Sequence, residues 1–260
     1  MEDCGPFVEY VLRSGARTNV LMAVSEGANS TQTLLDSDLA SESAVYNALT
    51  ELQDQGLIHE PCSKRWAPTG AGAVVAGLIE RQRETESVLG ADPEYWQNHD
   101  VTALPPAFRT RLADLAGGVV VRATDTQPSR AIRETERRLA EPDSVAVLAP
   151  IYNERFDAAA QDGDSLELIL DAGVIDDLRE GADEDESEAD IDEVRVAEFS
   201  FAMTVTDDCL MLSLPTLDGS YDPSTEFIAE SERARRWGRQ LFDCYWEDAQ
   251  ALEAYLTESG

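Results

Sequence analysis

Apolar residues recur at helical spacing over the first sixty residues of the chain. One or two short helices are predicted between residues 6 and 26, and a brief helix is predicted after Ser30. The clearest helix is expected to begin after Ser41, which is a favourable N-cap, and to end at Gly56. Its apolar face is formed by Val45, Leu49 and Leu52, spaced at i, i+4 and i+7.

A hairpin is predicted directly after this helix. Residues 57–60 alternate between apolar and polar side chains, residues 61–65 favour a turn, and Trp66-Ala67-Pro68 is expected to return along the first strand. Two helices joined by a turn and followed by a hairpin are typical of a winged helix-turn-helix domain, which we assign to residues 1–68. In that geometry the second helix of the motif lies in the major groove of DNA.

Candidate DNA contacts follow from this assignment. Short side chains near the start of a helix let it approach base edges while still presenting hydrogen-bonding groups. We therefore assign Ser41, Ser43, Ala44 and Asn47 to the groove. Contacts to the phosphate backbone are assigned to Thr31, Gln32, Lys64 and Arg65. The same pattern also fits a small helical scaffold that does not bind DNA.

The remainder of the chain is expected to hold a linker and a larger domain. Residues 69–100 are predicted to be a linker, with one long helix from Thr69 to about Leu89. Residues 101–260 alternate between strands and helices, which predicts an α/β domain with parallel strands flanked by helices in a mixed sheet. Strands are expected at 119–123, 144–148, 166–170, 194–199, 201–205 and 210–214, and helices at 107–115, 129–139, 153–160, 174–179 and 225–255.

The charge of the chain changes this picture. There are 52 acidic residues against 20 basic ones, giving a formal charge of −32, and Lys64 is the sole lysine. Such a surface would repel nucleic acid at ordinary ionic strength, but the Debye length falls to about 3 Å at 1 M salt. The composition therefore predicts a halophilic protein that works in a salt-rich cytoplasm. Residues 183–193 hold eight carboxylates and are expected to be a solvated loop.

Several sites and locations are not expected. No stretch of 18 apolar residues occurs, and the segment after Met1 lacks the basic start and apolar run of a signal peptide, so we expect a cytoplasmic protein without a membrane partner. Four scattered cysteines and two histidines do not predict a metal site. A phosphate-binding loop and an HExxH motif are absent, so no cofactor and no enzymatic activity are predicted.

Several motifs give the chain a resemblance to a known family. They are "LTELQDQGLI" at 49–58, Thr69 with Gly72, Tyr95-Trp96-Gln97-Asn98-His99-Asp100 followed by Leu104-Pro105-Pro106, "FSFAMTVTDDCLMLSLPTLDGSYD" at 199–222 and "ARRWGRQLFDCYWEDA" at 234–249. With these, most of the chain resembles archaeal winged-helix transcription regulators of the methanogenesis-regulatory, or filament-regulator, type. The resemblance implies an effector-sensing C-terminal domain similar in topology to a phospholipase D half. The HxKxxxxD motif of that hydrolase is absent here.

Together these observations predict a DNA-binding transcription regulator that acts as a homodimer and senses a small effector. The effector is expected at the carboxyl ends of the parallel strands, near Tyr152, Asp171 and Phe201, because ligands bind there in α/β sheets. The alternative is a protein–protein interaction module whose winged helix no longer binds DNA. Acidic residues in the first seventy positions favour that alternative.

Overall fold

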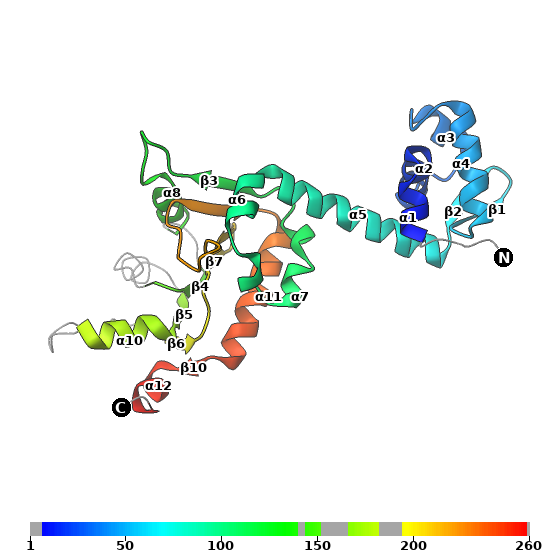
Figure 1. Ribbon diagram of the computed structural model, residues 1–260. Helices are drawn as coiled ribbons and strands as arrows, with labels where there is room; N and C mark the ends of the chain where they lie inside the picture. Colours follow the sequence, from blue (N-terminus) through cyan, green and yellow to red (C-terminus); the bar gives the residue numbers. More distant parts are fainter. Residues whose placement is uncertain (1–6, 140–143, 152–165, 182–193, 259–260) are drawn as a thin grey trace. The chain divides into compact units, whose positions relative to one another are not determined.

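The computed structural model describes residues 7–139, 144–151, 166–181 and 194–258 of the chain. The chain divides into two compact units, Met1–Arg83 and Glu84–Gly260. The division falls inside the long helix α5 (Gly70–Ala91), drawn in cyan to green in Figure 1. We call Met1–Arg83 unit 1 and Glu84–Gly260 unit 2.

The described part of unit 1, from residue 7 onward, contains four helices, a two-stranded hairpin and the first part of α5. The helices are α1 (Phe7–Leu12), α2 (Gly15–Ser25), α3 (Thr31–Asp36) and α4 (Glu42–Asp54). The N-cap predicted for α4 is confirmed, because the Ser41 hydroxyl accepts a hydrogen bond from the backbone N–H of Ala44. Gly56 follows the helix at a φ of +68°, a conformation that glycine adopts without strain. The predicted apolar face of α4 is buried with the core of unit 1.

The hairpin of unit 1 consists of β1 (Ile58–Cys62) and β2 (Arg65–Pro68), which pair antiparallel. Lys64 stands in its turn at a φ of +58°. The hairpin joins α5 through Thr69, whose hydroxyl accepts a hydrogen bond of 3.0 Å from the backbone N–H of Gly72. Gly72 lies so close to β1 that a Cβ there would be 1.8 Å from the carbonyl oxygen of Leu57. Only glycine fits this junction without displacing the backbone.

Unit 2 is built on a mixed sheet, as predicted. In the described part of the chain its eight strands follow the order β10-β6-β5-β4-β7-β8-β9-β3. Only the β4–β5 and β5–β6 pairs are parallel, and the other pairs are antiparallel. The strands are β3 (Val119–Arg122), β4 (Val145–Ala149), β5 (Leu166–Asp171), β6 (Val194–Ala197), β7 (Ala202–Thr206), β8 (Leu210–Ser213), β9 (Thr225–Ala229) and β10 (Gln250–Ala251).

Helices cover both faces of this sheet (Figure 1). On one face, α11 (Glu232–Asp248), α6 (Pro93–Asn98), α7 (Pro106–Arg109) and two short 3-10 turns, Val101–Ala103 and Leu112–Leu115, enclose the main core. On the other face, α10 (Ala172–Gly181) and α12 (Leu252–Glu258) pack on β4, β5 and β6, and α8 (Arg130–Leu139) packs near β8 and β9.

The prediction of one closing helix from Thr225 to Tyr255 is wrong. Residues Thr225–Ala229 form β9, an inner strand that pairs with both β3 and β8 and is buried along its whole length. Burial of two apolar faces removes the alternating pattern that marks a half-buried strand. The true start of α11 is signalled by Ser231, whose hydroxyl accepts a hydrogen bond of 3.1 Å from Ala234 N–H. The helix ends at Asp248.

The predicted helix at 107–115 is divided into α7 and the 3-10 turn Leu112–Leu115. The predicted helix at 153–160 and the acidic run at 183–193 lie outside the described residues. Within the described residues, no helix combines the length and the apolar character that crossing a bilayer requires.

Candidate nucleic-acid interface

The outward face of α4 carries polar side chains at helical spacing. Ser43, Asn47 and Thr50 are exposed at i, i+4 and i+7, opposite the buried apolar face of the same helix. Tyr46 lies among them with 49% of its surface exposed. A helix with one face in the core and hydroxyl, amide and phenol groups on the other can present donors and acceptors to base edges.

Ser41 and Ala44 differ from the other predicted groove residues. The Ser41 hydroxyl caps α4 and also lies 3.4 Å from the hydroxyl of Ser43. Ala44 is half-buried and offers only a methyl group. Tyr46 and Thr50 were not among the residues predicted from the sequence. Their position on the helical repeat of Ser43 and Asn47 is a signal that could have identified them.

The start of α3 is hydrogen-bonded to the returning strand of the hairpin. The backbone N–H of Trp66 donates to the carbonyl oxygen of Asn29 at 2.9 Å, and that of Thr31 donates to the carbonyl oxygen of Lys64 at 3.2 Å. Through these bonds the segment around Asn29 lies antiparallel alongside β2. The hairpin turn is thereby fixed relative to the helices of unit 1.

The role predicted for Thr31 is corrected by this arrangement. Its hydroxyl is buried and accepts a hydrogen bond of 3.0 Å from the indole Nε1 of Trp66, so it does not face a phosphate. Thr31 instead positions the hairpin. Gln32 is exposed, as a phosphate contact requires, and its Nε2 donates to the carboxylate of Asp36 at 2.8 Å.

The basic residues of unit 1 divide into two groups by their partners. Arg13 pairs with Glu9, and Arg17 pairs with Glu51 at 3.0 Å. Among the described residues before α5, Lys64 and Arg65 have no ion-pair partner. Arg65 donates from Nη1 to the neutral side-chain oxygen of Asn29 at 2.7 Å, which orients its guanidinium group and leaves the charge uncompensated.

The hairpin turn thus carries two positive charges that are not neutralised by neighbouring carboxylates within the part of unit 1 that the structure describes. The carboxylate of Glu60 accepts the backbone N–H of Lys64 and so bonds to the main chain of the turn. Both the turn and the polar face of α4 are mounted on one core, which includes Val45 and Leu49 from α4 and Ile58 and Trp66 from the hairpin. Such a pair of surfaces can hold phosphates and base edges at the same time.

Of the effector residues predicted in unit 2, Asp171 and Phe201 lie within the described residues. Tyr152 lies outside the described residues. Both carboxylate oxygens of Asp171 accept backbone N–H groups at 2.9 Å, one from Gly173 and one from Phe199, so this residue stabilises the end of β5. Phe201 is fully buried in the main core and has no surface for a ligand. Burial therefore argues against the role predicted for Phe201, and the role of Asp171 stays a prediction.

Comparisons with known proteins find similarity to a regulatory protein. Residues 128–248 match the family described as the middle domain of the methanogenesis regulatory protein FilR1. The FilR1 protein of Methanothrix harundinacea (strain 6Ac) is 24% identical over 222 residues, which is 80% of this chain and 50% of that relative. The chain is similar to an archaeal regulatory protein. It spans about half the length of that relative.

Similar solved structures are more distant. TrmBL2, titled an archaeal chromatin protein with a novel mode of DNA binding, shows 16% identity and a TM-score of 0.37, and the match covers 94% of this chain and 98% of that chain. The pyocyanin biosynthetic protein PhzM shows 12% identity and a TM-score of 0.24 over 66% of this chain and 58% of that chain. At these TM-scores neither structure supports a shared overall fold.

Proposed function

We propose that this chain is a sequence-specific DNA-binding transcription regulator and that residues 1–68 form its winged helix-turn-helix domain. One observation carries the proposal. In the described part of unit 1 before α5, the basic residues without an ion-pair partner are the two at the hairpin turn, where a wing meets the DNA backbone. In a chain with a charge of −32, two uncompensated cations at that position indicate a site for phosphate.

In this function α4 is the recognition helix. Ser43, Tyr46, Asn47 and Thr50 face the major groove, and Lys64 and Arg65 hold the backbone. Base edges are read by side chains at the N-terminal part of such a helix, which is where Ser43 and Asn47 lie. Gln32 at the start of α3 is a further backbone contact once its amide exchanges Asp36 for a phosphate oxygen.

We also propose that the regulator acts as a homodimer. On α5, Val74 and Leu78 expose 64% and 51% of their surfaces, four residues apart on one side of the helix. Exposed aliphatic side chains at that spacing are suited to pairing with the same helix of a second copy. Two-fold symmetry would place the DNA half-sites one helical turn or a multiple of it apart.

Residues 69–100 then serve as the linker and residues 101–260 as the effector-sensing domain. The match of residues 128–248 to the middle domain of a regulatory protein supports a regulatory role for this part. A phospholipase D-like topology and a non-enzymatic role remain predictions. An effector changes DNA binding only if it binds one arrangement of the two DNA-binding domains of the dimer more tightly than the other.

The charge of the chain supports a halophilic origin, and it sets the conditions for DNA binding. Counterion release contributes little in concentrated KCl, so affinity must come mainly from hydrogen bonds and fit. The polar face of α4 suits such binding better than a broad basic patch would.

The alternative is an interaction module that binds a protein through the same surfaces. It is favoured by the exposed carboxylates of Asp36, Glu42 and Glu60, which lie on the elements assigned to DNA. Chromatin immunoprecipitation in the source organism separates the two functions. Discrete promoter peaks that disappear in a strain carrying Lys64→Ser and Arg65→Ser support the regulator, whereas an absence of peaks with the wild-type chain contradicts it.

A further inference from the structure

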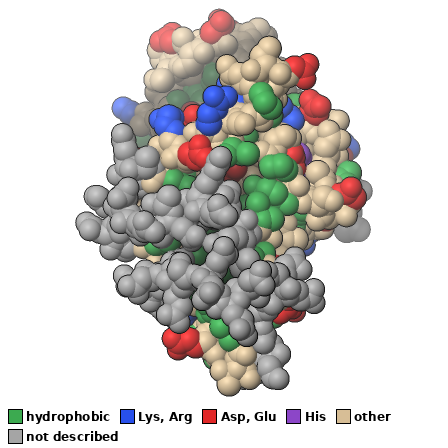
Figure 2. Space-filling view, turned by 90° about the vertical axis from the view of Figure 1, so that its left-hand side faces the viewer, with side chains coloured by type: hydrophobic (Ala, Val, Ile, Leu, Met, Phe, Trp, Pro, Cys, Tyr) green, Lys and Arg blue, Asp and Glu red, His purple; other side chains and the backbone are tan. Residues whose placement is uncertain are grey.

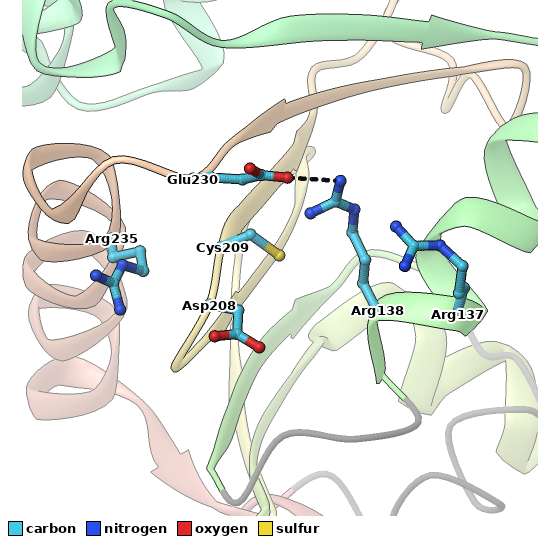
Figure 3. A pocket seen from close by; sticks show the side chains of 6 residues that line it. All are labelled: Arg137, Arg138, Asp208, Cys209, Glu230 and Arg235. Carbon is cyan, nitrogen blue, oxygen red and sulfur yellow. Dashed lines mark ion pairs between the residues drawn. The ribbon is translucent and has the colours of Figure 1, made fainter.

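A polar pocket of about 480 Å³ lies in unit 2 around the β7–β8 turn, between α8 and the start of α11. It is lined by side chains from α8, the β7–β8 turn, the end of β9 and the first turns of α11. These are Arg137, Arg138, Asp208, Cys209, Glu230 and Arg235 (Figure 3). Figure 2 views the molecule from the side on which α8 and α10 lie in Figure 1, and Lys and Arg side chains gather in the upper part of that view.

The pocket is rich in arginine, whereas the chain as a whole is acidic. Three guanidinium groups and two carboxylates line it, and Glu134 beside it pairs with Arg137 and Arg138, while the chain carries a formal charge of −32. All six lining residues fall within the segment 128–248 that matches the regulatory middle domain. Three guanidinium groups gathered in so acidic a protein, two of them held by the counter-ions Glu134 and Glu230, point to an anionic ligand.

Arg235 is the least satisfied of the three arginines. One of its terminal nitrogens donates to the carbonyl oxygen of Asp207. Its Nε is buried and has no hydrogen-bond partner among the described residues. A buried N–H without a partner is unfavourable, and an oxygen of a bound anion would satisfy it.

Arg138 is held by two carboxylates of different character. Glu134, on the same helix, accepts from Nε of Arg138 at 2.8 Å and also pairs with Arg137, and hydrogen bonds from these arginines lower the pKa of Glu134 to about 2. Glu230 pairs with a terminal nitrogen of Arg138 at 2.8 Å but exposes 67% of its side chain. The Arg138 side chain is only 17% exposed, so the arginine keeps its place while the solvent-exposed Glu230 can be replaced by another anion.

We propose that this pocket binds a small hydrophilic dianion, a phosphate ester or a dicarboxylate, between Arg137, Arg138 and Arg235. The planar guanidinium groups match paired oxygens of either group, and the incoming anion replaces Glu230 on Arg138. The polar lining excludes an apolar ligand, and the volume accommodates a metabolite of a few carbon atoms. The pocket can bind its ligand whether or not the chain binds DNA. Its role in regulation rests on the proposed function.

The position of Glu230 links the pocket to α5 within unit 2. Glu230 directly precedes Ser231, the N-cap of α11. One residue into the helix, Arg233 pairs with Glu84 of α5 at 2.6 Å and with Asp114 at 3.1 Å. Release of Glu230 from Arg138 therefore acts on the end of α11 that is bonded to α5, the helix that continues from the DNA-binding unit.

The proposal is tested by titrating the full chain at constant KCl and following its melting temperature. Glycerol 3-phosphate and malonate are the two probes, and glycerol is the uncharged control. We expect a saturable rise in melting temperature with at least one dianion and none with glycerol, and the stronger probe identifies the ligand class. The absence of a saturable response to both dianions overturns the proposal.

Variants then locate the site. Arg137→Ser with Arg235→Ser should weaken binding of the probe at least about tenfold, since two of the three anion-binding groups are lost. The matched control is Arg236→Ser, which removes an exposed arginine paired with Glu232 on the same helix and should leave binding unchanged. Glu230→Gln should tighten binding several-fold, because it frees Arg138 without changing the shape of the side chain. Equal effects of the double variant and the control, or weaker binding by Glu230→Gln, would place the site elsewhere.

A parallel measurement separates this proposal from the proposed function. If the probe binds the wild-type chain but neither promoter DNA nor genomic fragments bind, the anion site is supported and the regulator function is contradicted. If DNA binds and the probe does not, the regulator function is supported and the anion site is contradicted.

Discussion

The indole Nε1 of Trp66 donates a hydrogen bond of 3.0 Å to the hydroxyl of Thr31. This bond joins the returning strand of the hairpin to the first residue of α3, over a separation of 35 residues in the sequence. The orientation of the hairpin thus depends on a buried contact with the helices, in addition to the hydrogen bonds of the hairpin itself.

Thr31→Val is expected to destabilise unit 1. The substitution keeps the shape of the side chain but leaves the Trp66 N–H without its acceptor, so the free energy of unfolding should fall by roughly 1–3 kcal/mol. Urea unfolding followed by the change in tryptophan fluorescence measures this. Thr257→Val on the exposed side of α12 is the control and should change stability by less than about 0.5 kcal/mol. Equal stability of the two variants would show that the bond contributes nothing.

Gly72→Ala and Gly77→Ala should have opposite effects, although both glycines lie on α5. A Cβ at residue 72 would overlap the Leu57 carbonyl oxygen, whereas a Cβ at residue 77 would meet nothing within 4 Å. We expect Gly72→Ala to lower the melting temperature and Gly77→Ala to stabilise the helix by roughly 0.5–1 kcal/mol. Thermal denaturation measured by circular dichroism compares them. A stabilising Gly72→Ala would mean that the contact between α5 and β1 is looser than described.

Glu226 should make the stability of unit 2 depend on pH. This carboxyl on β9 is buried, accepts a hydrogen bond of 2.9 Å from Ser213, and burial raises its pKa to about 7. An unfolded glutamate ionises near pH 4.3, so between that pH and about 7 the unfolded chain binds fewer protons than the folded one. The contribution of Glu226 to stability is therefore lost as pH rises through this window.

Glu226→Gln removes this dependence. Relative to the wild type, the variant should gain roughly 2 kcal/mol in free energy of unfolding between pH 5 and pH 8. Chemical denaturation at the two pH values measures the difference. Glu232→Gln, an exposed residue at the start of α11, is the matched control and should show no such gain. A pH-independent difference between wild type and Glu226→Gln would mean that Glu226 ionises normally in the folded chain.

Salt should stabilise the folded chain if its composition is halophilic. Repulsion among surface carboxylates is screened as the Debye length shortens, so the melting temperature should rise between about 0.5 M and about 3 M KCl. DNA affinity should depend only weakly on KCl over the same range. A melting temperature that does not respond to KCl would contradict the halophilic interpretation.

Local signals in the sequence were sufficient for unit 1. Ser41 as a cap, Gly56 as a stop and the apolar spacing of Val45 and Leu49 all act within one or two helical turns, and α4 and the hairpin follow from them. The role of Thr31 could not be predicted, because it depends on a partner 35 residues away. A polar residue at a helix start has the same sequence pattern whether it faces solvent or a tryptophan.

Unit 2 was predicted less completely, since its elements are specified by tertiary context. Thr225–Ala229 is surrounded by strands on both sides, and its burial could not be known from its neighbours in the sequence. The predicted effector position relied on strand ends, but Phe201 faces the core there. The arginine-lined pocket joins α8, the β7–β8 turn and α11, which are far apart in the sequence. Arg137-Arg138 at the end of a predicted helix was the one local signal for it.

The central claim is that unit 1 binds duplex DNA through α4 and the hairpin turn. Fluorescence anisotropy with a promoter duplex identified by chromatin immunoprecipitation, at constant KCl, tests it most directly. Lys64→Ser with Arg65→Ser should weaken binding about tenfold for every sequence tested, because phosphate contacts are lost, and Arg13→Ser, whose charge is already paired with Glu9, should bind as the wild type does. Equal affinity of the double variant and the wild type would contradict the account.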